Sequence, residues 1–111
     1  MAYGLTDREW NKLLALFASN ERIEQAILYG SRAKDTFKPF SDVDITLVGA
    51  DLSRKDLNQI YMEVDDLLLP YQFDLSLFHS LNNKDLIDHI QRRGIVIYNK
   101  VKKQEQNREF N

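Results

Sequence analysis

The strict alternation of apolar and polar residues from Asp42 to Val48 most constrains how this chain can fold. Apolar side chains occupy every second position, and two aspartates and a threonine fill the positions between them: Val43, Ile45 and Leu47 against Asp42, Asp44 and Thr46. Because successive side chains of a strand point to opposite faces, this pattern predicts a half-buried β-strand. The chain must therefore form a sheet with one covered face and one polar face.

Further segments extend this sheet and cover it. Phe73 to Phe78 alternates in the same way, and short apolar runs predict strands near Ile23–Tyr29 and Ile95–Tyr98. Thr6 with Glu9 has the pattern of a helix capping box, and Ser53 and Asn83 are suited to cap two later helices. A short helix is expected directly after Gly30. This order predicts an α/β fold, with a small mixed β-sheet of about four strands packed against helices.

The length of 111 residues suits one domain, expected over residues 1–99, with a polar C-terminal tail over 100–111 that is either a frayed helix or disordered. The chain has no cysteine, which excludes disulfides, thiolate zinc sites and a cysteine nucleophile. A formal net charge of −2 argues against a broad nucleic-acid-binding surface. No apolar run approaches the roughly 20 residues that span a bilayer, and no signal-peptide pattern is present, so a cytoplasmic protein without membrane contact is expected.

Gly30-Ser31-Arg32 follows the first predicted strand and has the composition of a phosphate-binding turn. Glycine allows the backbone to approach an anion closely, the hydroxyl of Ser31 is a donor, and the planar cation of Arg32 suits phosphate. The alternative is a turn that needs a glycine and a capping serine for structural reasons alone.

Three aspartates are candidates for a metal site. Asp42 and Asp44 are two residues apart on one strand and therefore share a face, where their charges repel unless a cation lies between them. Asp74 lies on the polar side of the later alternating strand. If the two strands are neighbours, the three carboxylates converge, which suits two Mg²⁺ ions in phosphoryl transfer, and Mn²⁺ would fit the same ligands. The alternative is a solvated strand face.

Together these residues resemble the signature of the DNA polymerase β-like nucleotidyltransferase superfamily: Gly30-Ser31-Arg32-Ala33, then Asp42-Val43-Asp44-Ile45, with Asp74 matching the third carboxylate. The resemblance extends from the first helix to Tyr98 and is greatest to the minimal nucleotidyltransferase (MNT) branch, whose members often act as antitoxins paired with HEPN-domain toxins. It implies a nucleotidyltransferase fold.

The resemblance also implies roles for these residues. Gly30 and Ser31 would hold the β- and γ-phosphates of a nucleoside triphosphate, with assistance from Arg32. Asp42 and Asp44 would bind both Mg²⁺ ions, and Asp74 would bind the catalytic ion and help to activate the acceptor hydroxyl.

Two neighbouring positions depart from the pattern of many relatives. Those relatives have a second basic residue and a glycine where this chain has Lys34 and Asp35. Lys34 keeps the charge without the forked donor geometry of arginine. Asp35 adds a negative charge near the expected triphosphate.

Three functions follow from the resemblance. The first is transfer of AMP from ATP to a tyrosine of a cognate HEPN toxin. The second is an antitoxin that neutralises its partner by binding alone. The third is modification of a small molecule such as an aminoglycoside, although relatives of that kind usually carry an extra helical domain. Exposed apolar residues on the helices could also support a homo- or hetero-oligomer.

Overall fold

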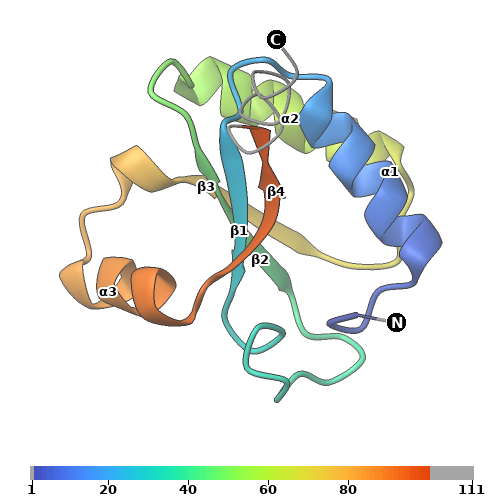
Figure 1. Cartoon of the computed structure of the whole chain (residues 1–111). Helices are drawn as coiled ribbons and strands as arrows, with labels where there is room; N and C mark the ends of the chain where they lie inside the picture. Colours follow the sequence, from blue (N-terminus) through green and yellow to red (C-terminus); the bar gives the residue numbers. More distant parts are fainter. Residues whose placement is uncertain (1, 101–111) are drawn as a thin grey trace, which may run out of the picture.

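The computed structural model describes residues 2–100, which form three helices and a four-stranded sheet (Figure 1). In chain order the elements are α1 (Asp7–Ala18), β1 (Gln25–Tyr29), β2 (Val43–Val48), α2 (Arg54–Asp66), β3 (Phe73–Leu77), a 3₁₀ turn (Phe78–Ser80), α3 (Lys84–Arg93) and β4 (Ile95–Asn99). No helix within this range is long and apolar enough to cross a membrane.

The sheet has the strand order β3-β2-β1-β4. β1 is antiparallel to both β2 and β4, whereas β2 and β3 are parallel and are connected through α2. The predicted mixed sheet of about four strands is therefore confirmed, and the parallel β2–β3 pair sets the positions of the polar residues along both strands.

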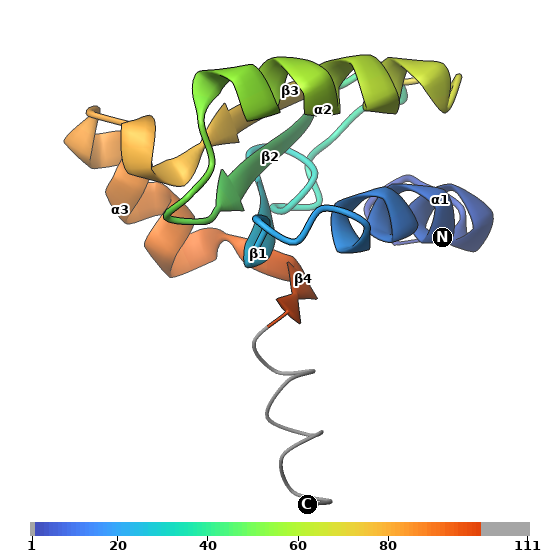
Figure 2. The same cartoon turned by 90° about the horizontal axis from the view of Figure 1, so that it is seen from above.

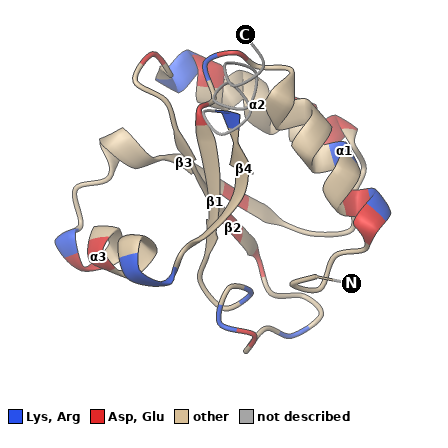
Figure 3. Cartoon of the chain, viewed as in Figure 1, with Lys and Arg blue, Asp and Glu red and all other residues tan. Residues whose placement is uncertain are grey.

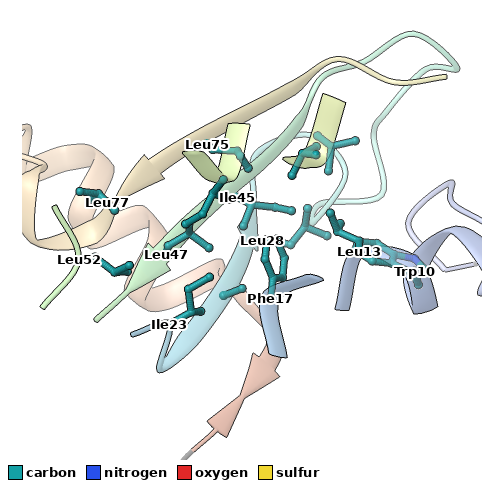
Figure 4. Close-up of a cluster of buried hydrophobic side chains, with 14 of the residues drawn as sticks. Trp10, Leu13, Phe17, Ile23, Leu28, Ile45, Leu47, Leu52, Leu75 and Leu77 are labelled. Carbon is teal, nitrogen blue, oxygen red and sulfur yellow. The ribbon is translucent and has the colours of Figure 1, made fainter. Parts of the chain in front are cut away.

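Two helices cover one face of the sheet and a third lies on the other side. α1 and α2 pack against the apolar face, while α3 lies across the sheet from them (Figure 2). The alternation of β2 determines this arrangement, because Val43, Ile45 and Leu47 are all fully buried. Figure 4 shows Ile45 and Leu47 among the side chains of α1 and β3.

The predicted helix starts are confirmed at all three helices. Thr6 and Glu9 form a reciprocal capping box at α1, and Ser53 does the same with Asp56 at α2. The Asn83 side chain accepts hydrogen bonds from the first backbone N–H groups of α3. Each cap satisfies donors that would otherwise lack a partner at the helix start.

The prediction of a short helix after Gly30 is wrong. Residues 31–35 form successive turns, and Asp35 ends them with a left-handed φ of 63°. A right-handed helix cannot continue through that conformation. The left-handed backbone also gives a physical reason for the glycine that relatives carry at this position.

The first residue of the predicted tail, Lys100, directly follows β4. Its backbone N–H donates to the Glu24 carbonyl at 2.9 Å and its Nζ donates to the Glu21 carbonyl at 2.7 Å. The expectation of a frayed or disordered tail concerns residues 101–111, which lie outside the described residues.

Candidate active site

The three predicted aspartates lie at one end of the sheet. The parallel register of β2 and β3 places Asp44 directly opposite Asp74, and Asp42 immediately precedes β2. Figure 3 shows acidic stretches of β2 and β3 next to each other in the middle of the molecule. The condition on which the sequence argument depended, that these strands are neighbours, is therefore met.

The carboxylate of Asp44 shows how strongly these groups interact. Burial and the negative charges of Asp74 and Asp42 together raise the pKa of Asp44 to about 6, against the opposing effect of the Arg32 guanidinium. The local field thus disfavours a second and third negative charge. A bound cation would reverse that effect.

The aspartates have no directly bonded partner within the described chain. Within residues 2–100, the carboxylates of Asp42, Asp44 and Asp74 accept no hydrogen bond and form no salt bridge. In the same range, no three His, Cys, Asp or Glu side chains are gathered tightly enough to form a ready-made metal cluster. Mutual repulsion of like charges is a physical reason for that spacing.

The turn after β1 brings the backbone against this acidic group. Gly30 has a φ of +78°, and a Cβ atom at this position would collide with Oδ2 of Asp44, which is paired across the sheet with Tyr29, the residue before Gly30. Only glycine combines this conformation with such a close approach. Among the described residues the hydroxyl of Ser31 has no hydrogen-bond partner, so it is available to a ligand. Gly30 therefore lies against Asp44, and Ser31 follows it directly in the chain.

Arg32 does not lie with them, and the predicted contact with phosphate does not fit its surroundings. Its side chain is only 1% exposed. The guanidinium donates to the backbone carbonyls of Ser41 (2.8 and 3.1 Å), Tyr3 (2.9 Å) and Pro39 (3.5 Å). It also lies about 5 Å from the ring centres of Phe37 and Tyr71. All three of its guanidinium nitrogens are engaged in holding the loop and the N-terminal segment, so Arg32 has a structural position.

Several hydroxyl groups that the sequence argument did not select share the polar face with the aspartates. The Ser76 hydroxyl donates to that of Thr46 at 2.9 Å, and Thr46 is fully buried. Burial raises the pKa of Tyr29, a hydrogen bond with Ser76 opposes the rise, and the charges of Asp74 and Asp44 add to it. The period-two alternation could have identified Thr46 and Ser76, because each lies two residues after an aspartate on its strand.

The sequence of residues 11–103 matches the family described as Polymerase beta, Nucleotidyltransferase. The chain belongs to this nucleotidyltransferase family. The match includes the glycine turn and all three aspartates, and members of the family generally use divalent metal ions. No curated protein matches this chain significantly.

Solved structures share the fold of this nucleotidyltransferase. A toxin–antitoxin structure with AMP-PNP is 22% identical, with a TM-score of 0.68 over 87% of this chain and 78% of the other. A complex of a tri-AMPylated Shewanella oneidensis HEPN toxin with its MNT antitoxin is 18% identical, with a TM-score of 0.64 over 92% and 79%. A putative nucleotidyltransferase from Sulfolobus solfataricus is 16% identical, with a TM-score of 0.54 over 84% and 78%. At these identities the likeness establishes the fold.

The donor set of this nucleotidyltransferase suits a divalent metal. Asp42, Asp44 and Asp74 offer hard carboxylate oxygens that are unpaired and repel one another. Mg²⁺ and Mn²⁺ prefer such ligands and leave coordination positions for water and phosphate oxygens. The residues present therefore fit the metal that the family generally uses.

Proposed function

We propose that this chain transfers AMP from ATP to a hydroxyl group of a partner protein, a tyrosine of a HEPN-type toxin, and thereby acts as an antitoxin. The observation that supports it most is the unpaired carboxylate group of Asp42, Asp44 and Asp74 next to the Gly30 turn. The shared fold with MNT antitoxins, one of them in complex with an AMPylated HEPN toxin, points to the nucleotide and the acceptor.

In this proposal each residue has a task. The Gly30 backbone and the Ser31 hydroxyl hold the β- and γ-phosphates. Asp42, Asp44 and Asp74 hold the two divalent ions, which when bound neutralise phosphate charge and orient the triphosphate. Lining up the acceptor with the α-phosphorus and neutralising charge supply most of the rate enhancement.

The bond changes are those of an in-line displacement. The acceptor oxygen forms a bond to the α-phosphorus while the bond from that phosphorus to the bridging oxygen breaks, and pyrophosphate leaves. Asp74 is solvent-exposed and takes the proton of the acceptor hydroxyl before releasing it to water.

Co-expression with the product of the neighbouring gene, followed by intact mass spectrometry of both proteins, tests the proposal. The wild type is expected to add the mass of one or more AMP groups to the partner, and Asp42→Asn/Asp44→Asn is expected to add none. Asp65→Asn/Asp66→Asn removes the same charge from the exposed end of α2 and should behave as the wild type.

The outcomes separate the alternative functions. A partner that stays unmodified but co-purifies with both the wild type and the double variant would replace the enzymatic proposal with an antitoxin that acts by binding. A partner that neither binds nor is modified would direct the search to small hydroxylated acceptors.

A further inference from the structure

The loop between β1 and β2 carries an exposed aromatic side chain close in sequence to Asp42 and Asp44. Phe40 is 86% exposed and lies two residues before Asp42. Since consecutive Cα atoms are about 3.8 Å apart, the Cα atoms of the two residues lie within about 7.6 Å of each other. The loop that contains Phe40 extends beyond the end of the sheet at which the aspartates lie (Figure 1).

The backbone around Phe40 is held in a defined turn. Lys38 to Ser41 is a β-turn in which the Ser41 N–H donates to the Lys38 carbonyl at 3.0 Å, with Pro39 and Phe40 as the central residues. The Ser41 hydroxyl also accepts from the Lys38 N–H at 2.8 Å. Proline at the first central position fixes φ at a value this turn requires.

Arg32 also holds this turn in place. Its guanidinium donates to the carbonyls of Pro39 and Ser41, which flank Phe40 on either side. The ring of Phe40 is therefore exposed on a rigid support. A backbone ordered in this way loses little conformational entropy when a partner covers the side chain it carries, which is typical of the anchors of protein interfaces.

Within residues 2–100, three other large apolar residues are exposed, and they lie away from this loop. Met62 lies on α2, Leu68 follows the end of that helix, and Val96 lies on β4. None of the three is adjacent in sequence to a site aspartate. Phe40 alone among these four combines exposure, an anchored backbone and a position next to the carboxylates.

We propose that Phe40 is the docking residue for the acceptor protein, inserting its ring into an apolar recess beside the acceptor hydroxyl. The inference rests on the proposed function and names the part of the site that recognises its macromolecular substrate. The position on an extended loop favours a recess in a protein surface over a nucleotide, which would be held at the Gly30 turn.

The test compares Phe40→Ala with Leu68→Ala, which removes an equally exposed apolar side chain (87%) away from the site. Binding to the purified partner protein of the co-expression experiment is measured by titration calorimetry in the Asp42→Asn/Asp44→Asn background, so that the result does not depend on chemistry. Phe40→Ala is expected to weaken binding by about 10-fold or more, and Leu68→Ala to leave it unchanged.

Two further measurements show whether the Phe40 ring contributes to binding of the partner or of ATP. In the background with intact aspartates, Phe40→Ala should raise KM for the partner with little change in kcat, and the Kd of ATP with Mg²⁺ should stay that of the wild type. Unchanged partner affinity would overturn the inference, and weaker ATP binding would assign the ring to the nucleobase instead. If partner binding depends on Phe40 but no AMP is transferred, the proposed function fails while the docking surface stands.

Discussion

Arg32 and Asp44 are charged groups only a short loop apart, and their surroundings differ in a way that separates structure from function. The guanidinium of Arg32 is buried, hydrogen-bonded to three backbone carbonyls and flanked by two aromatic rings. The carboxylate of Asp44 is only partly buried, has two like charges nearby and has no hydrogen bond within the described chain. A satisfied charge stabilises the fold, whereas an uncompensated group of charges of one sign requires a ligand.

The comparison predicts that substitution of Arg32, whose guanidinium nitrogens are all hydrogen-bonded, causes the largest loss of stability. Arg32→Met should lower the free energy of unfolding by about 3 kcal/mol, because it leaves the carbonyls of Tyr3 and Ser41 buried without donors. Urea unfolding followed by circular dichroism measures this. Arg32→Lys restores the charge but not the fork of donors and should recover only part of the loss. A loss below about 1 kcal/mol for Arg32→Met would contradict the structural role.

A second substitution probes the contact between the glycine turn and the aspartate. Gly30→Ala should lower stability by about 1–3 kcal/mol, because alanine is strained at a φ of +78° and its Cβ meets Oδ2 of Asp44. The same variant should weaken ATP binding. In an Asp44→Ala background part of the stability cost should disappear, since the collision is removed while the backbone strain remains. Equal costs in both backgrounds would show that the contact with Asp44 is unimportant.

At Asp44, whose carboxylate has no bonded partner among the described residues, we expect a neutral substitution to raise the stability of the fold and not to lower it. Asp44→Asn should raise the stability of the metal-free protein at pH 8 by about 1–2 kcal/mol, which allows for solvent screening of a half-exposed carboxylate. Chemical unfolding in the presence of EDTA measures it, with Asp65→Asn as the matched control on α2. A destabilised Asp44→Asn would show that this carboxylate supports the fold.

The same pKa predicts a pH dependence of stability. The folded-state pKa of Asp44, about 6, lies above the unfolded value near 3.8, so proton uptake favours the folded state. This contribution is fully present below pH 3.8 and is lost as the pH rises through 6. Without divalent ions, the advantage of Asp44→Asn over the wild type should therefore grow between pH 4 and pH 7. An advantage that does not change with pH would refute the electrostatic explanation.

The smallest effect is expected at Asp35. Asp35→Gly should raise stability by about 0.5 kcal/mol, because glycine accepts the left-handed φ of 63° without strain but has more freedom in the unfolded chain. Removal of the negative charge should also strengthen ATP binding slightly if the side chain faces the triphosphate. Thermal unfolding and a nucleotide titration distinguish the two contributions, and Asp35→Asn serves as the control for charge alone.

The sequence predicted most of the fold because its local patterns agree with the burial of the chain. The alternation of β2 identified the core-facing residues, and the caps located all three helix starts. The pairing of Asp44 with Asp74 could be stated only as a condition, since strand order depends on long-range packing. The role of Arg32 was not predictable, because one of its partners, Tyr3, is 29 residues away and offers only a backbone carbonyl, which leaves no trace in the sequence.

The most direct test of whether the aspartates form a cation-dependent nucleotide site is the thermal unfolding of the wild type and of Asp44→Asn with and without ATP and Mg²⁺. The wild type is expected to gain about 5 °C or more in Tm when both ligands are present at about 100 times their Kd. Asp44→Asn is expected to start from a higher Tm at pH 8 and to gain little. A variant that starts lower than the wild type and responds equally to ATP and Mg²⁺ would contradict the assignment of the aspartate group as a cation-dependent nucleotide site.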